Sequence, residues 1–182
     1  MRRRGLIAAS PFGSRIFRRP VASATGRLSC AGAILRVMAT FLLKTEPDDY
    51  RYADLQRDGR TVWDGVANAT ACLHMRAAKA GDAALIYETG GHKRVTGLAR
   101  LVSEPYADPE RPDLTKAGEI KFVVFDLEPV AEATKDGATL AAIKADPRFG
   151  GFELVTQSRL SAMPVPATLD RALRAMAGLP SR

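Results

Sequence analysis

Short apolar runs separated by polar turns make up most of the chain and predict its first elements. Phe41-Leu42-Leu43 predicts a buried strand, and Thr61-Val62-Trp63 predicts a second, brief strand or extended segment. Between them, Asp48 is suited to cap a short helix over about residues 49–57, which Gly59 then stops.

Further helices are predicted where apolar positions recur at helical spacing. Asn68 is suited to cap one that ends before Gly81. Its expected apolar stripe is Ala69, Cys72, Leu73 and Ala77. A short helix is expected near residues 140–145, and a C-terminal helix is expected to stop at Gly178. The stripe of the C-terminal helix is Leu169, Ala172, Leu173, Met176 and Ala177.

Three stronger strands lie between these helices. Residues 83–87 are continuously apolar, residues 95–102 contain Gly97, where another group is expected to approach the backbone closely, and residues 120–127 are apolar on both faces. A strand with two apolar faces lies inside a sheet. Residues 105–119 are polar and predict a loop. Short strands mixed with short helices, without regular alternation, predict an α+β fold.

The positive charge of the chain is concentrated in its first 37 residues, which carry eight arginines and no acid. The formal net charge of +7 therefore does not describe the rest of the chain, where 19 basic side chains stand against 20 acidic ones. Any nucleic-acid contact made by residues 38–182 must come from a local patch.

Residues 1–37 are expected to be a disordered Arg-rich extension, and residues 38–182 to form one domain. Because Met38 runs straight into an apolar strand, the extension either lies upstream of the true start, is an organellar transit peptide, or is a functional basic arm. The expected location is cytoplasmic for a bacterial-type source, and organellar or nuclear if the extension is real and the source is eukaryotic. No apolar run has membrane-spanning length, so no membrane partner is expected.

The sequence contains little of the chemistry that enzymes use. It has no Gly-rich phosphate loop, no nucleophile elbow and no metal-binding His pair. The two cysteines, Cys30 and Cys72, are too few for a zinc site. Cys72 and His74 are two residues apart on an expected helix and do not face each other, and His92 is expected at an exposed loop tip. No catalytic residue, metal or cofactor is therefore expected.

Four sequence segments together resemble the EVE domain of the PUA-like superfamily, and within it the thymocyte nuclear protein group and its bacterial counterparts. They occur in family order and at family spacing across nearly all of residues 40–177. The segments are FLLKTEPD at 41–48, VWDGV at 62–66 followed by Asn68, KAGD at 79–82 leading into the strand of Tyr87, and QSRLS at 157–161 with Pro164-Val165.

The resemblance implies a mixed β pseudo-barrel flanked by short helices, with a pocket for a modified base. In the family this base is chiefly a modified cytosine of DNA, and RNA bases are plausible for stand-alone members. By motif position, the resemblance implies that the ligand-binding residues are Lys44, Trp63, Asp64, Val66, Asn68, Tyr87 and Thr89. Arg159, in the fourth segment, either contacts the nucleic-acid backbone or pairs with an acid.

Several of these residues have a second interpretation. Trp63 is either a core aromatic or a wall on which a base stacks. Asn68 either caps a helix or recognises a base edge, and its single carbonyl oxygen does not easily do both. Lys44 either reaches solvent or contacts a base or phosphate. Tyr87 and Thr89 end a strand at the expected rim of the pocket.

Three positions depart from the usual family pattern. Ala67 and Thr156 stand where members often have Arg, and Glu88 stands where they often have His. Fewer cations and one more anion are expected to weaken the attraction to phosphate. The leading hypothesis is a non-catalytic module that binds a modified base. The alternatives are an enzyme or enzyme subunit acting on nucleosides, and a protein-interaction module with a vestigial pocket.

The proposed boundary at Met38 gives a first prediction. Deleting residues 1–37 should leave the thermal unfolding midpoint unchanged within error, because an Arg-, Ser- and Gly-rich segment offers little apolar surface to pack. Circular dichroism melts of the full chain and of residues 38–182 provide the comparison. A drop of more than a few degrees would place part of the extension on the fold.

Overall fold

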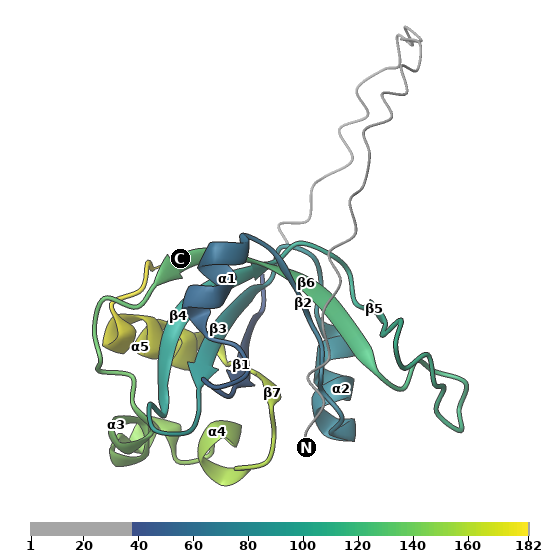
Figure 1. Cartoon of the computed structure of the whole chain (residues 1–182). Coiled ribbons are helices and arrows are strands. Elements are labelled where there is room, and N and C mark those ends of the chain that lie inside the picture. The colour runs from purple at the N-terminus through teal and green to yellow at the C-terminus, as the bar shows by residue number, and fades with distance from the viewer. Residues whose placement is uncertain (1–37, 182) are drawn as a thin grey trace, which may run out of the picture. The chain divides into compact units, whose positions relative to one another are not determined.

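The computed structural model describes residues 38–181, so the expectations for residues 1–37 lie outside the described part of the chain. These residues form one curled, mixed sheet flanked by short helices (Figure 1), which confirms the predicted α+β pseudo-barrel. The strands are β1 (Thr40–Thr45), β2 (Thr61–Trp63), β3 (Ala83–Glu88), β4 (Arg94–Leu101), β5 (Tyr106–Ala107), β6 (Val123–Glu132) and β7 (Ala162–Pro164). The helices are α1 (Tyr52–Asp58), α2 (Ala69–Ala77), α3 (Leu140–Ala145), α4 (Glu153–Thr156) and α5 (Ala167–Ala177), with a 3₁₀ turn at Pro147–Phe149.

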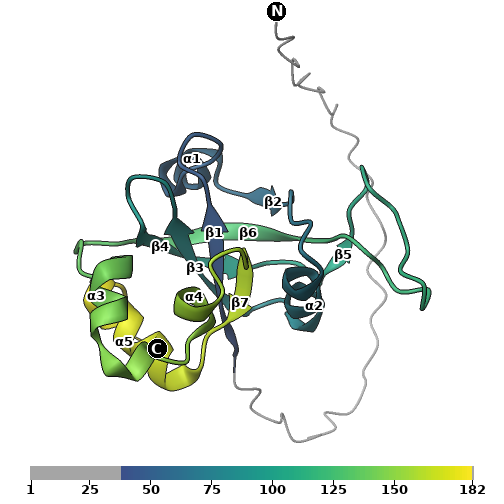
Figure 2. The ribbon, with the colours of Figure 1, turned by 90° about the horizontal axis from the view of Figure 1, so that it is seen from below.

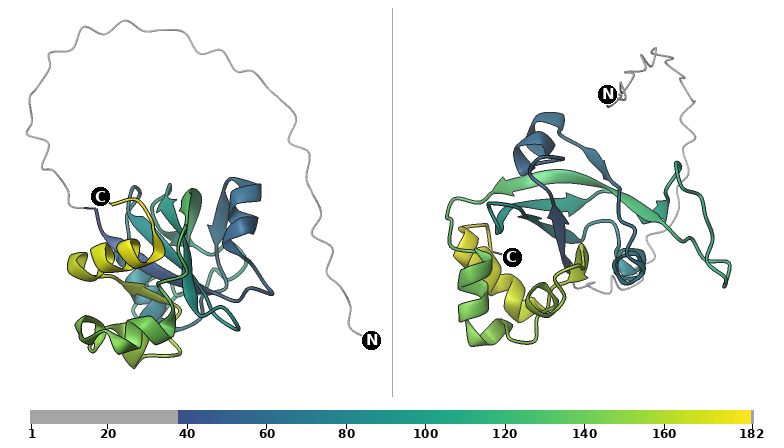
Figure 3. Two further views of the ribbon diagram at one scale, coloured as in Figure 1. Left: turned by 90° about the vertical axis from the view of Figure 1, so that its left-hand side faces the viewer. Right: turned by 60° about the horizontal axis from the view of Figure 1, so that its bottom comes forward.

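The strand order in the sheet is β2-β6-β4-β3-β1-β7, and β5 pairs only with β6. β1 and β3 are parallel, and the other neighbours are antiparallel. Every side chain of β3 is buried. Figures 2 and 3 show α1 on one side of β6 and the other helices on the opposite side. The sheet is therefore covered on both faces, and β2 and β7 are its two end strands.

The first helix starts later than its sequence predicts. Instead of covering residues 49–57 behind an Asp48 cap, α1 begins at Tyr52. The segment before it forms a turn, in which the main-chain oxygen of Glu46 accepts two hydrogen bonds of 3.0 Å. The Tyr52 N–H then donates to the carboxylate of Glu88, 36 residues further along the chain, at 3.0 Å. The Arg51 N–H also donates to the carboxylate of Asp54 at 2.9 Å, so a local capping contact and a long-range contact together mark the start of α1.

Two helix stops and one helix cap are where the sequence predicts them. Gly59 and Gly178 stop α1 and α5 in the left-handed region, with φ of 72° and 66°. Asn68 caps α2, since its Oδ1 accepts from the N–H groups of Thr70 at 2.9 Å and Ala71 at 3.1 Å. Among residues 38–181, no helix is long and apolar enough to cross a membrane.

The predicted apolar stripe of α2 is wrong except at Cys72. Leu73 is 58% exposed, and Ala69 and Ala77 are exposed as well. The buried face of the helix is instead Ala71, Cys72, Met75 and Ala78. α2 has apolar residues on two sides, and its packing against β6 and β7 decides which side is buried.

β6 also differs from its prediction. It starts at Val123 rather than at residue 120 and continues to Glu132, while Ile120 forms only an isolated bridge with Leu114. The expected loop over 105–119 contains the short strand β5. β6 is nevertheless internal, as predicted, because β2 lies on one side of it and β4 and β5 on the other.

Gly97 allows the close approach that the sequence suggested. A Cβ atom at this position would lie 2.3 Å from Cε2 of Tyr52, whose ring covers the backbone of β4. The Tyr52 hydroxyl donates to the main-chain oxygen of Leu98 at 2.8 Å, which holds the ring in place. The glycine therefore lets α1 pack directly on the sheet.

Replacing this glycine should loosen α1 from the sheet. Gly97→Ala is expected to lower the free energy of unfolding by about 1–3 kcal/mol, because the added methyl group overlaps the Tyr52 ring. Urea denaturation measures the loss. Gly151→Ala is the matched control, since a Cβ there meets no atom within 4 Å. Equal stability of the two variants would contradict the packing described.

Candidate functional site

A cavity of about 570 Å³ lies between the two ends of the sheet. β2 and the turn after it, Thr61–Val66, form one wall, and the segment before β7, residues 158–161, forms another. The remaining lining residues are Lys44, Thr45, Glu46, Asp49, Tyr50 and Thr89. β2 and β7 are the end strands, so the cavity lies where the curled sheet does not close into a full barrel. We call it the seam cavity.

Lys44 joins the end of β1 to the wall before β7. Its main-chain N–H donates to the Ser161 oxygen at 2.8 Å, and its Nζ donates to the Ser158 oxygen at 3.1 Å. Partial burial lowers the pKa of the Lys44 amine from its ordinary value. The ammonium group is therefore held at the cavity wall, and it has further N–H groups with which to contact a ligand.

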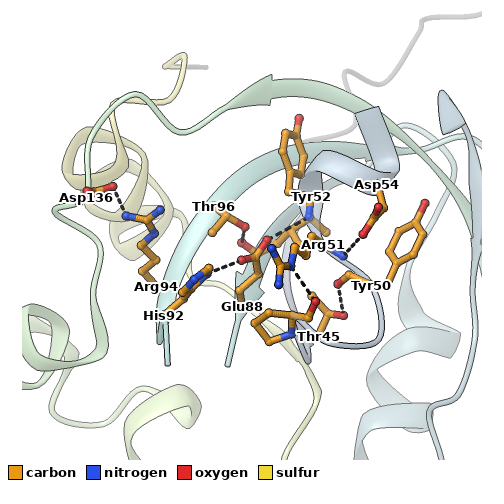
Figure 4. Close-up of polar contacts among 12 residues, drawn as sticks. Thr45, Tyr50, Arg51, Tyr52, Asp54, Glu88, His92, Arg94, Thr96 and Asp136 are labelled. Atoms are coloured by element: carbon orange, nitrogen blue, oxygen red, sulfur yellow. Dashed lines mark hydrogen bonds and ion pairs between the residues drawn. The ribbon is translucent and has the colours of Figure 1, made fainter. Parts of the chain in front are cut away.

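A buried carboxylate holds the wall that carries Tyr50 (Figure 4). Glu88 is 4% exposed; its Oε1 accepts from the Tyr52 N–H, and its Oε2 lies 2.8 Å from Nδ1 of His92. Thr45, at the end of the neighbouring strand β1, donates from its Oγ1 to the main-chain oxygen of Tyr50 at 2.7 Å. Glu88 does not line the cavity, so the anion that it adds lies behind the cavity wall.

Trp63 is a core aromatic, as one of its two interpretations predicts, and it also reaches the cavity. It is only 7% exposed and belongs to the hydrophobic core, yet it lines the seam cavity. Asp64 and Val66 line the cavity from the turn that follows. Thr89 lines it from the end of β3, and within residues 38–181 its Oγ1 is buried without a hydrogen-bond partner. Such an orphaned hydroxyl is available to a ligand.

Two of the predicted ligand-binding residues are not brought to the cavity. Asn68 uses its side-chain oxygen to cap α2. Tyr87 is 3% exposed in the core rather than at a rim, and burial raises the pKa of its phenol to about 12. Neither residue lines the seam cavity. The structure therefore gathers Lys44, Trp63, Asp64, Val66 and Thr89.

Arg159 lies at the cavity on an exposed segment, and in the described part of the chain its guanidinium makes no hydrogen bond or ion pair. The ion pair considered from sequence is not formed. The cavity nevertheless has more acids than bases, because Glu46, Asp49 and Asp64 accompany Lys44 and Arg159.

Sequence reasoning missed several lining residues. Glu46, Ser158 and Ser161 lie inside the motif segments 41–48 and 157–161, so the motifs themselves were the available signal. Tyr50 and Thr61 carried no such signal, because only the curvature of the sheet brings them to the cavity.

His74 and Glu153 form a second polar cluster, between α2 and α4. Nε2 of His74 lies 3.7 Å from Oε1 of Glu153, a neighbour that the sequence did not indicate. Cys72 is buried and its Sγ donates to the Val66 oxygen, so it does not join the pair. Neither His74 nor Glu153 lines the seam cavity. Over residues 38–181, no three His, Cys, Asp or Glu side chains are grouped so that they could hold a metal ion.

The curled mixed sheet flanked by short helices has the fold of PUA-like pseudo-barrels. Within that class, the chain belongs to the EVE domain family, whose model matches residues 39–176. No protein among the curated sequences matches the chain.

Solved structures agree with this assignment. The Rhodopseudomonas palustris protein Rpa0253 is 34% identical, with a TM-score of 0.69 and coverage of 80% of this chain and 97% of that one. The Agrobacterium tumefaciens protein Atu2648 is 27% identical, with a TM-score of 0.70 and coverage of 79% and 96%. Human THYN1, crystallised in complex with 5-methylcytosine-containing DNA, is 24% identical, with a TM-score of 0.67 and coverage of 78% and 99%.

Two variants of Asn68 distinguish its role as a helix cap from a role as a ligand contact. Asn68→Ala should lower the free energy of unfolding by about 1 kcal/mol, because two N–H groups of α2 lose their acceptor. Asn68→Ser keeps a capping oxygen but removes the amide, so it should retain both stability and ligand affinity. Denaturant melts and ligand titrations on both variants check this. Selective loss of affinity in Asn68→Ser would make the amide a ligand contact.

Proposed function

We propose that this chain is a non-catalytic module that binds a modified base of DNA or RNA in the seam cavity. The observation that carries the proposal is the cavity itself, which combines the indole of Trp63 with polar groups that have no partner, such as Thr89 Oγ1. Its volume of about 570 Å³ suits a small molecule or one nucleoside. The complex of human THYN1 with 5-methylcytosine-containing DNA supports a base as the ligand.

The charge around the cavity favours a base over a phosphate as the group that enters it. Glu46, Asp49 and Asp64 oppose an anion, and one N–H of Lys44 is already used by Ser158. Carboxylates accept hydrogen bonds from exocyclic amino groups of bases. Arg159, exposed and without a partner in the described part of the chain, is placed to contact the nucleic-acid backbone outside the cavity.

A base held in this way has left its stack. Extruding it costs a few kcal/mol, which stacking on an aromatic ring and hydrogen bonds to the base edge offset. Trp63 exposes only a small area of its ring to a ligand. The polar contacts of Lys44, Asp64 and Thr89 therefore have to provide much of the selectivity for the base.

One experiment distinguishes this function from its alternatives. The protein is incubated with a mixed pool of modified nucleosides, washed, and examined by mass spectrometry. A binding module retains one nucleoside unchanged, whereas an enzyme would convert it. A protein that retains nothing, and whose fluorescence does not respond to any nucleic acid, would be an interaction module instead.

Trp63 is the only tryptophan in the chain, so its fluorescence reports directly on the cavity. Trp63→Ala should weaken binding of the retained nucleoside by roughly 5- to 150-fold, the equivalent of about 1–3 kcal/mol of stacking. It should also lower the free energy of unfolding by about 3–5 kcal/mol, because most of the ring is buried. Trp63→Phe keeps an aromatic face and should retain part of the affinity. Calorimetric titration below the unfolding transition measures binding.

Phe125→Leu is the matched control for this pair. Phe125 is opposite Trp63 in the β2–β6 ladder and is fully buried, but it does not line the cavity. Its variant should lose stability without losing affinity. If Trp63→Ala changed only stability and left affinity intact, the indole would be a core residue alone.

A further inference from the structure

The outer edge of β2 has an unpaired main chain, and the register of the sheet shows which residue presents it. β2 pairs only with β6, and Val62 lies opposite Asp126. The N–H of Asp126 donates to Ser103 Oγ, and its oxygen accepts from the N–H of Val102, both at 2.9 Å on the β4 side. In an antiparallel strand, both main-chain groups of a residue point to the same side. Asp126 therefore turns its groups away from β2.

The residue opposite Asp126 must then turn its own groups away from β6. Val62 consequently directs its N–H and C=O toward the free edge of β2, while Thr61 and Trp63 pair with Leu127 and Phe125. Val62 lines the seam cavity. Its oxygen receives one long hydrogen bond of 3.5 Å from Thr61 Oγ1, and within residues 38–181 its N–H has no partner.

We propose that Val62 recognises the hydrogen-bonding edge of the base with its main-chain N–H and C=O groups, an inference that rests on the proposed function. A strand residue offers one donor beside one acceptor, and the Watson–Crick edge of a base offers an acceptor beside a donor. The two edges are therefore complementary. Thr89 Oγ1, buried and unpartnered at the same cavity, offers a third polar contact.

This geometry has a consequence for the partner. A base bound to Val62 through its Watson–Crick edge cannot be paired with another base at the same time. The chain should therefore bind its target base more tightly in single-stranded nucleic acid than in a matched duplex, where the pair must first be broken.

An extended peptide could also add to a free strand edge, but β2 suits it poorly. Strand addition uses main-chain groups at alternate residues along several positions. β2 has three residues, and two of them are committed to β6, so only Val62 offers a free pair within the strand. The chain then turns at Gly65, whose φ is 73°. One donor and one acceptor match a single base edge better than a peptide strand.

Val62→Pro removes the N–H without removing a ladder hydrogen bond, because this N–H faces the free edge, where proline is tolerated. Val62→Ala is the matched control, since it trims the side chain and keeps the N–H. The probes are 5-methylcytidine and its N3-methylated counterpart, in which the base edge is blocked. Titration calorimetry on the full chain measures affinity, and a thermal melt measures folding.

The expected result is that Val62→Pro melts within a few degrees of Val62→Ala and binds 5-methylcytidine about tenfold more weakly than Val62→Ala, so that the difference between the two variants measures the lost N–H. The wild type should also bind the N3-methylated probe at least tenfold more weakly, which tests the same contact without a mutation.

Equal affinity for both probes, or unchanged affinity in a folded Val62→Pro variant, would overturn main-chain recognition and leave the proposed function standing. If the wild type bound neither probe nor any nucleoside of the mixed pool, the proposed function itself would fail. If Val62→Pro abolished binding of an extended peptide but not of the nucleoside, the edge would belong to strand addition.

Discussion

The burial of β3 on both faces is the constraint on which the rest of the fold depends. All six of its side chains are excluded from solvent, so the sheet needs cover on each side. α1 supplies one cover, with Tyr52 packed directly on Gly97, and the other helices lie opposite (Figure 2). β1 joins β3 in parallel, and β7 is added at its outer edge. The sheet curls around this centre, and β2 and the segment before β7 both line one cavity.

The seam cavity is thus a consequence of incomplete closure. A barrel that closed fully would pair the edge of β2 and leave no unsatisfied main chain there. In this fold, Val62, whose main-chain groups face the free edge of β2, lines the cavity together with Thr89 and Trp63. Unpaired polar groups in a partly buried site reduce stability, and a ligand that hydrogen-bonds to them recovers that free energy. The open seam therefore links the architecture to binding.

The charged residues near the cavity fall into two groups, one buried behind its wall and one lining it. Glu88 is buried behind the cavity wall, where it accepts from the Tyr52 N–H and contacts His92, so it anchors α1 and takes no part in the charge of the site. Glu46, Asp49 and Asp64 are exposed at the cavity with Lys44 and Arg159. In the proposed function, this balance disfavours deep entry of a phosphate and suits a neutral base that donates hydrogen bonds.

The sequence by itself determined what depends on neighbouring residues. The strand of Phe41–Leu43 follows from its apolar run, and the cap at Asn68 and the helix stop at Gly59 follow from local capping chemistry. The family resemblance implied seven ligand-binding residues, and five of them line the cavity. Only the tertiary structure decided what depends on partners distant in the chain. Glu88 accepts a hydrogen bond from the first N–H of α1, packing on β6 and β7 decides the buried face of α2, and Tyr87 lies in the core. The free main chain of Val62 follows from the register of β2 against β6, which pairs residues more than 60 positions apart. No pattern within a short window encodes that register, because it is fixed by the curvature and packing of the whole sheet.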